Sequence, residues 1–442
     1  MQVVHHGALH GVTGSCHQLV LDDANSLLVD CGLFQGKDAR NSDEDQIDFS
    51  LDGIHALIVT HVHLDHIGRI PYLIAAGFNE PIYCSPPTAK LLPLMMEDAL
   101  RVGVTKNKRL IERFMQELRR FIRPMPYYEW HDVGHGVRLR LTPAGHVLGS
   151  SVVEIEYESE RVVFSGDLGS RHQPILKDPI SPERADLLVL ESTYGNRNHV
   201  GRQQRVEQLE KILSRTLEDK GVTIIPAFSV GRTQELLYEM NAIFDGLGHK
   251  IECPILKGVD VLIDSPLAQR FTELYNAMQE YWDAEAQQVL TWDDQPLVFE
   301  NLVEIGNHAD HRETMQYIKE SELPAVVIAA SGMCSGGRVV NYLKEFLSNP
   351  TTDIVFVGYQ AEGTPGRYIQ DSDWVRLDGK RYDVRAKTHT LSGYSAHADQ
   401  SDLLRFVEGM QEAPKAIRLV HGETEAKATL QGELEKRGYH VV

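Results

Sequence analysis

The feature that most constrains this chain is a run of metal-binding side chains, HVHLDH at residues 61–66, directly behind an apolar stretch of strand length. A loop that follows a buried strand is held rigidly, so His61 and His63 can point to one side while Asp65 and His66 turn to another. Imidazole nitrogens and a carboxylate suit zinc, and suit manganese or iron less well. Among twenty histidines one His-x-His pair would arise by chance, but the whole run behind a strand is far rarer. The run therefore predicts a metal site at a strand end.

Three further residues repeat this setting, and one loop cannot complete two metal coordination spheres by itself. His146, Asp167 and His421 each follow an apolar, strand-like segment, and each stands next to a glycine. Taken singly, a histidine or aspartate beside a glycine is usually only a turn residue. Together they repeat one arrangement, which predicts further ligands. Because a carboxylate has two oxygens, Asp167 can bridge two metal ions.

Composition narrows the class of protein. The formal net charge of −19 over 442 residues argues against a generic basic nucleic-acid binder and against a protein of anionic membrane surfaces. The acidic net charge does not exclude a nucleic-acid enzyme whose positive charge is confined to one part of the molecule. No apolar run approaches the roughly 18 residues of a membrane span, and residues 1–14 lack the pattern of a secretory signal. Five scattered cysteines without a Cys-x-x-Cys pair predict no disulfide framework, so we expect a cytoplasmic protein.

The pattern of predicted helices and strands changes twice along the chain. Short strand-like segments dominate the first two hundred residues, and the pair 17–20 and 26–29 predicts a hairpin. From about residue 196, helical and strand-like segments alternate, which is typical of a parallel sheet with crossover helices. Short strand-like segments separated by turns are predicted again from near residue 386. The sequence thus predicts an α/β protein whose outer domain is interrupted by an inserted α/β domain.

Charge is concentrated in two segments. Residues 101–123 carry eight basic and two acidic side chains on helix-like sequence. A solvated helix face is the favoured interpretation, and attraction of phosphate is the alternative. Residues 271–323 are strongly acidic and are interpreted as a solvated surface. His308 and His311, within that segment, are expected to be surface or loop residues.

Two glycine- and serine-rich loops of the inserted domain each follow a strand and open a helix. Backbone N–H groups at such a helix start favour an anion, and an arginine adds a forked donor. Ordinary strand-to-helix turns would explain the glycines but not an arginine after both loops. We therefore predict contacts with substrate phosphate from Ser229, Arg232, Ser331, Gly332 and Arg338.

An ordered set of seven motifs resembles the metallo-β-lactamase superfamily and its β-CASP branch. The superfamily motifs are Asp30 in VDCG, the run 61–66, His146 and Asp167. The branch motifs are residues 191–195 (ESTYG), 395–399 (SAHAD) and 421–423 (HGE). The branch contains nucleases such as the endonuclease subunit of the eukaryotic cleavage and polyadenylation factor, archaeal relatives and ribonuclease J. The set runs from residue 30 to residue 423, so the resemblance covers nearly the whole chain.

The resemblance implies a fold and a ligand set. The fold is an αββα metallo-β-lactamase sandwich, residues 1–196 and 386–442, with a β-CASP domain inserted at 197–385 and built on a parallel sheet. Two zinc ions per chain are implied, with manganese as the alternative. One zinc takes His61, His63 and His146, the other takes Asp65, His66 and His421, and Asp167 bridges them. Asp30 then orients a ligand histidine from behind it.

The resemblance also implies a substrate. A histidine in the third branch motif, here His421, accompanies RNA rather than DNA in this family, so the expected partner is single-stranded RNA, and a homodimer is expected by the same analogy. The expected reaction is hydrolysis of RNA phosphodiesters by a bridging hydroxide, leaving 5′-phosphate and 3′-hydroxyl ends. His397, held by Glu191, is the expected general acid. Asp65, Glu191 and His397 are the candidate catalytic residues.

Two rival interpretations use the same ligands. A dinuclear-metal hydrolase of a small-molecule ester, lactone or thioester would need the metal core, but neither Glu191 and His397 nor a large inserted domain. A catalytically inactive scaffold would be expected to have lost ligands, whereas every expected position is filled. The sequence does not distinguish internal cleavage from stepwise release at the 5′ end.

Overall fold

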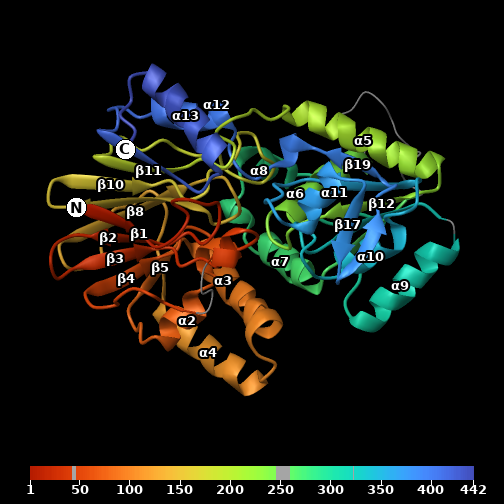
Figure 1. Cartoon of the computed structure of the whole chain (residues 1–442), viewed down its shortest axis with the longest axis horizontal. Helices are drawn as coiled ribbons and strands as arrows, with labels where there is room; N and C mark the ends of the chain where they lie inside the picture. Colours follow the sequence, from red (N-terminus) through yellow and green to blue (C-terminus); the bar gives the residue numbers. More distant parts are fainter. Residues whose placement is uncertain (42–45, 245–258, 322) are drawn as a thin grey trace. The chain divides into compact units, whose positions relative to one another are not determined.

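The chain forms two compact units in the structure, which is a computed structural model (Figure 1). It describes residues 1–41, 46–244, 259–321 and 323–442. The first unit comprises residues 1–171, 176–198 and 397–442, and the second comprises 172–175 and 199–396. The change in the pattern of predicted helices and strands placed the corresponding boundaries near residues 196 and 386.

Two six-stranded sheets form the first unit. In spatial order the first sheet contains β1 (Gln2–His5), β2 (His17–Val20), β3 (Ser26–Val29), β4 (Ile54–Ile58), β5 (Ile82–Cys84) and β6 (Ile122–Pro124). The second contains β20 (Ala416–Val420), β11 (Leu187–Glu191), β10 (Glu160–Phe164), β9 (Ser151–Tyr157), β8 (Val137–Pro143) and β7 (His131–Asp132). The predicted hairpin is confirmed, because β2 and β3 pair antiparallel from His17↔Val29 to Val20↔Ser26.

An apolar core lies between these sheets. Leu19, Val29 and Ile58 of the first sheet share one buried cluster with Val153 and Phe164 of the second. Helices cover the outer faces (Figure 1): α12 (Gln400–Glu408) and α13 (Thr424–Lys436) pack on the second sheet, and α2 (Ile70–Ala75), α3 (Pro86–Ala99) and α4 (Lys108–Phe121) lie beside the first. The short α1 (Leu64–Ile67) follows β4. The arrangement is the expected αββα sandwich.

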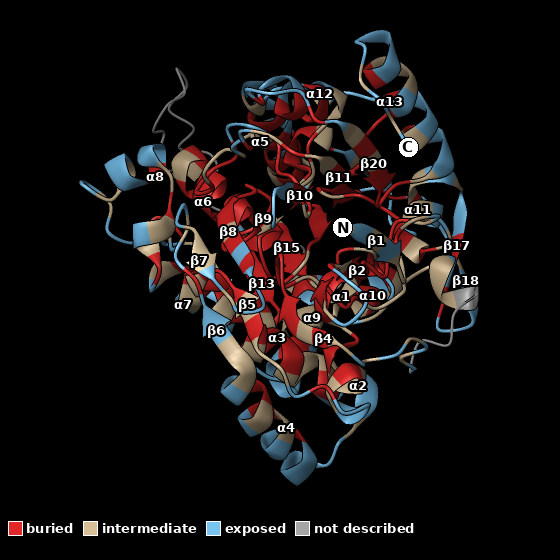
Figure 2. Cartoon of the chain, turned by 90° about the vertical axis from the view of Figure 1, so that its left-hand side faces the viewer, coloured by how far each residue is buried: buried red, intermediate tan, exposed pale blue. Residues whose placement is uncertain are grey.

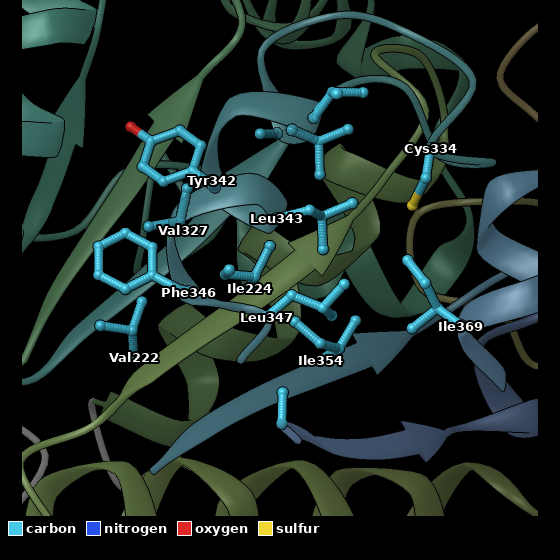
Figure 3. Packing of buried hydrophobic residues seen from close by; sticks show 14 of the residues in the cluster. Val222, Ile224, Val327, Cys334, Tyr342, Leu343, Phe346, Leu347, Ile354 and Ile369 are labelled. Carbon is cyan, nitrogen blue, oxygen red and sulfur yellow. The ribbon is translucent and has the colours of Figure 1, made fainter. Parts of the chain in front are cut away.

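The second unit is built on a parallel six-stranded sheet, as the alternating texture predicts. Its order is β14 (Leu302–Glu304), β13 (Asp260–Asp264), β15 (Ala325–Ala329), β12 (Val222–Pro226), β16 (Thr352–Phe356) and β19 (Lys387–Thr390). The helices are α5 (Arg202–Glu218), α6 (Arg232–Phe244), α7 (Pro266–Asn276), α8 (Ala284–Val289), α9 (His308–Ser321), α10 (Val339–Phe346) and α11 (Pro365–Asp371); β17 (Trp374–Leu377) and β18 (Lys380–Asp383) form a hairpin. Apolar side chains of α10, including Leu343 and Phe346, pack onto Ile224 and Ile354 of the sheet (Figure 3).

One surface prediction is wrong. His311 lies on α9 with only 1% of its side chain exposed, and its Nδ1 lies 2.5 Å from Oδ2 of Asp264. Because the acidic segment is amphipathic rather than uniformly solvated, this histidine faces inward. Within the described ranges, no helix is long and apolar enough to cross a membrane. The four described cysteines are buried and unbridged, and Cys253 lies outside the described residues.

Candidate metal centre

The predicted ligands meet at one edge of the first unit, because each follows a strand that ends there. His61 and His63 come after β4, and His146 comes after β8. Asp167 follows β10, and His421 follows β20 in the same sheet. All seven predicted ligands fall into two groups whose ligand atoms lie within 4.8 Å of one another. Residues that are hundreds of positions apart in the sequence are thereby brought together.

The first group comprises His61, His63, His146 and Asp167. Nδ1 of His63 lies 3.2 Å from Nε2 of His61 and 3.0 Å from Nε2 of His146. Oδ2 of Asp167 lies 3.5 Å from Nε2 of His61 and 3.6 Å from Nε2 of His146. Three imidazoles and one carboxylate oxygen therefore converge on one point, a ligand set that suits zinc.

The second group comprises Asp65, His66 and His421, and it shares Asp167 with the first. Nε2 of His421 lies 3.3 Å from Nε2 of His66 and 3.4 Å from Oδ2 of Asp65. Oδ1 of Asp167 lies 3.3 Å from His66 Nε2 and 3.6 Å from His421 Nε2. The two oxygens of Asp167 thus face different groups, which is the placement that a bridging carboxylate requires.

Hydrogen bonds behind the ligands fix which ring nitrogen faces the centre. Oδ2 of Asp30 lies 2.7 Å from Nδ1 of His66 and accepts from the Thr60 hydroxyl at 2.8 Å, while Oδ1 accepts from Thr60 N at 2.8 Å. Oγ1 of Thr193 lies 3.1 Å from Nδ1 of His421. Since Nδ1 is engaged in both rings, Nε2 is left for the centre. The family resemblance implied the supporting role of Asp30. Neither threonine was predicted, although Thr60 directly precedes the run 61–66 and Thr193 lies within the motif 191–195.

Electrostatics at the centre fit a cation. Burial holds the pKa of His61 well below its ordinary value and lowers that of His63 to about 4, so both rings are neutral and present lone pairs. Burial also acts against a charge on His66, but the carboxylates of Asp167 and Asp30 outweigh it and hold its pKa well above its ordinary value. The lone pairs of the neutral His61 and His63 rings point toward one another and toward the buried carboxylate of Asp167. A cation between these groups would stabilise them. The residues present therefore fit metal ions.

The two remaining catalytic candidates lie beside this centre. Nδ1 of His397 lies 3.1 Å from Oε1 of Glu191, which also accepts from Leu168 N at 2.8 Å. Burial alone would lower the pKa of His397, but the carboxylates of Glu191 and Asp167 outweigh it and raise that pKa to about 9. The His397 side chain is 14% exposed, whereas that of Glu191 is 1% exposed. His397 can therefore meet a substrate while Glu191 supports it from within.

Backbone geometry explains the glycine beside each ligand. A Cβ added to Gly169 would stand 1.8 Å from the carbonyl oxygen of Gly145, so the loops that carry Asp167 and His146 approach too closely for any side chain there. Asp30 and His421 have φ angles of 60° and 51°. Non-glycine residues in this left-handed region are strained, and such strain is typically held at functional sites. The glycines next to the candidate ligands are crowded as well. A Cβ at Gly145, Gly166 or Gly422 would stand 2.8, 3.0 or 2.7 Å from a backbone oxygen, so the strand-ligand-glycine pattern reflects close packing of loops.

The predicted phosphate contacts lie at the carboxyl ends of β12 and β15 in the second unit. Arg232 is buried, with its NH1 2.5 Å from Oε2 of Glu235. Arg338 is 19% exposed, and its NH1 lies 2.5 Å from Oδ1 of Asp264. Both guanidinium groups thus hold carboxylates of their own unit. Ser229, Ser331 and Gly332 lie in the loops where they were expected, and phosphate binding by this set stays a prediction.

Three family models match the chain in succession. The model of the metallo-beta-lactamase superfamily matches residues 12–227, that of the Beta-Casp domain matches 233–369, and that of the Zn-dependent metallo-hydrolase RNA specificity domain matches 381–442. The last of these covers His397 and His421.

Named relatives match over the same span. The chain is 37% identical to ribonuclease TTHA0252 of Thermus thermophilus over 448 residues, which cover 100% of this chain and 97% of that protein. It is 30% identical to the transcription termination factor FttA of Methanocaldococcus jannaschii and 31% identical to that of Thermococcus kodakarensis, and spans 66% of each. A crystal structure of a protein of unknown function from Enterococcus faecalis V583 matches with a TM-score of 0.57 at 13% identity, covering 99% of this chain and 96% of that one. At that identity the likeness concerns the fold alone.

Proposed function

Because the chain belongs to the β-CASP branch of the metallo-β-lactamase superfamily, we propose that it is a zinc-dependent ribonuclease acting on single-stranded RNA. The proposed products carry 5′-phosphate and 3′-hydroxyl ends. The name of the Thermus relative and the RNA specificity domain matched at residues 381–442 support RNA as the substrate. A cytoplasmic location belongs to the same proposal, and a homodimer stays a prediction.

The observation that carries the proposal is the position of Asp167. Its Oδ2 faces His61 and His146 while its Oδ1 faces His66 and His421. One carboxylate between two complete ligand sets supports two metal ions per chain, with zinc favoured by five imidazoles and manganese as the alternative. When bound, such a pair of metal ions lowers the pKa of water and stabilises charge on a phosphoryl group.

The residues of the chain supply the proton for the leaving 3′-oxygen. Because Nδ1 of His397 is turned toward Glu191, Nε2 is the atom that can donate that proton. Glu191 is itself held as an acceptor by the backbone N–H groups of Leu168 and Thr193, at 2.8 and 3.2 Å. It therefore stabilises a protonated His397 and fixes the direction of the ring. A positioned acid of this kind contributes about 10²- to 10⁴-fold to a rate.

The test uses purified protein and a 5′-labelled single-stranded RNA beside the DNA of the same sequence. The control is the Asp65→Ala/His66→Ala variant, which lacks two ligands of the second group. We expect cleavage of RNA and not of DNA, and loss of cleavage in the variant. Released nucleotides would indicate attack from the 5′ end, and internal fragments would indicate endonucleolytic cleavage. If wild-type protein with metal bound leaves RNA intact, the proposal fails.

A further inference from the structure

The helix α4 presents cationic side chains that its packing does not explain. Its inner face buries Ile111, Met115 and Leu118. Its outer face is exposed to solvent (Figure 2). The segment 101–123 has eight basic and two acidic residues in a chain of net charge −19. The positive charge is therefore local and lies where the fold does not require it.

Four of the exposed residues form a straight line along the helix, which we call the arginine stripe. They are Arg109, Arg113, Gln116 and Arg120, spaced by four, three and four residues and all exposed. At 3.6 residues per turn this spacing keeps them within about 60° around the axis and about 16 Å along it. The backbone positions of the three arginines are thus spaced by about 6 and 10 Å along the helix axis.

Only Arg120 among the cations of the stripe is paired with a carboxylate in the described part of the chain. The structure pairs neither Arg109 nor Arg113 with a carboxylate among the described residues. Arg120 lies 3.2 Å from Glu117, but its side chain is 73% exposed, and such a surface pair contributes little. Helix formation does not require arginine either, because glutamine and lysine have similar helix propensity. What arginine adds is a planar fork of donors that matches phosphate oxygens.

The stripe lies away from the metal centre but on the same unit. Ser85 caps the start of the helix α3, and its Oγ donates to the carbonyl oxygen of Gly149 at 2.6 Å, in the loop that carries the candidate ligand His146. Its 14 residues extend for about 21 Å before the chain turns into α4. At about 3.4 Å per stacked nucleotide, about six nucleotides span that distance. A tetranucleotide is shorter than this helix, whereas a strand of about 20 nucleotides is longer.

We propose that the arginine stripe is a second RNA-binding site, which holds the phosphate backbone of a strand whose scissile bond lies in the metal centre. This inference rests on the proposed ribonuclease function. Most of the chain is acidic and repels a polyanion, so a concentrated row of cations is where a strand gains attraction. The contacts are with phosphates, so the site recognises backbone and not sequence.

The test compares two variants that remove the same charge from two exposed helices of the first unit. Arg109→Gln/Arg113→Gln alters the stripe. Lys436→Gln/Arg437→Gln removes two cations at the end of α13 and is the matched control. Both are made in the Asp65→Ala/His66→Ala background, so that RNA is bound without being consumed. Binding of a labelled RNA of about 20 nucleotides is measured by fluorescence anisotropy over a range of salt concentrations.

We expect the stripe variant to bind about tenfold more weakly near 0.1 M salt. Its salt slope should fall by about 1.4, or about 0.7 for each phosphate that the variant no longer neutralises. The control is expected to change affinity less than twofold. With intact ligands, kcat/KM should fall in the stripe variant for the long RNA far more than for a tetranucleotide.

Unchanged affinity and slope in the stripe variant, or an equal weakening in the control, would overturn the inference. If wild-type protein cleaves neither RNA, the proposed ribonuclease function is refuted instead. The two failures can be told apart because the binding assay does not depend on catalysis.

Discussion

Replacing Asp30 by asparagine tests whether a residue behind the ligands controls the metal centre. The Asp30 carboxylate only accepts hydrogen bonds, so Nδ1 of His66 carries a proton, and Nε2, which faces Asp167 and His421, is the nitrogen that offers its lone pair when a metal binds. In Asp30→Asn, the amide oxygen still accepts from Thr60 N, and the NH₂ group then turns toward His66. Two donors now oppose each other, so the His66 ring must move its proton to Nε2 or turn away. Either response removes the lone pair from the second group.

The expected magnitude follows from the burial of this hydrogen bond. The Asp30–His66 contact of 2.7 Å is buried at both ends, and removing such support typically costs 10- to 100-fold in metal affinity or activity. That range corresponds to about 1.4 to 2.7 kcal/mol. The group of His61, His63 and His146 has no direct hydrogen bond to Asp30 among those the structure describes, and it is linked to Asp30 through the Thr60 hydroxyl, which lies 3.1 Å from Nδ1 of His61. One metal is therefore expected to bind more weakly and the other to stay.

Isothermal titration of the metal-free protein with zinc, together with RNA cleavage at limiting zinc, measures this. The matched control is Asp264→Asn, which changes a buried Asp–His pair of the second unit, with His311, and leaves the metal centre intact. We expect one tight and one weakened site in Asp30→Asn, and two unaltered sites in the control. If Asp30→Asn binds two zinc ions as tightly as wild type and cleaves RNA at the same rate, the argument from the His66 tautomer is refuted.

Three further substitutions give distinct outcomes. His397→Ala is expected to slow RNA cleavage by about 10²- to 10⁴-fold while both metals are retained; a rate near wild type would exclude it as the acid. Gly169→Ala is expected to lower the melting temperature and the metal content, because the new Cβ overlaps a backbone oxygen, whereas Gly306→Ala, with open space around it, should change neither. Arg232→Ala is expected to destabilise the second unit by about 3 to 5 kcal/mol in chemical denaturation, since it leaves Glu235 buried without its partner; wild-type stability would contradict that.

The clustering of the candidate metal ligands could be predicted from the sequence because the information about them is local. A ligand such as His146 or His421 follows a strand and adjoins a glycine, and both neighbours are visible in the sequence. Strands of one sheet end at common edges, so ligands at strand ends meet even when they are hundreds of residues apart. The two-unit fold was predictable for a similar reason, since alternating helices and strands require a parallel sheet.

What could not be predicted depends on partners distant in the sequence. Thr193 and His421 meet across 228 positions, and nothing about a threonine in a motif says that it will hold a ring nitrogen. Arg232 follows a glycine-rich loop like a phosphate ligand, yet its guanidinium lies against Glu235 because α6 is buried on nearly all sides. His311 was assigned to the surface from the acidity of its segment, but one face of that helix is buried. The composition of a segment averages over both faces of a helix, so it cannot show that a residue such as His311 lies on the buried face.

In the proposed ribonuclease, the carboxylate of Asp167 bridges and organises two metal ions for RNA hydrolysis. The most direct measurement determines the metal-to-protein ratio and the RNA cleavage rate on the same preparations of wild type and Asp167→Asn. An asparagine keeps the shape of the side chain but replaces one of the two oxygens that face the ligand groups. We expect two metal ions per wild-type chain with RNA cleavage, and at most one ion with little cleavage in the variant. Two ions and undiminished cleavage in Asp167→Asn would contradict it.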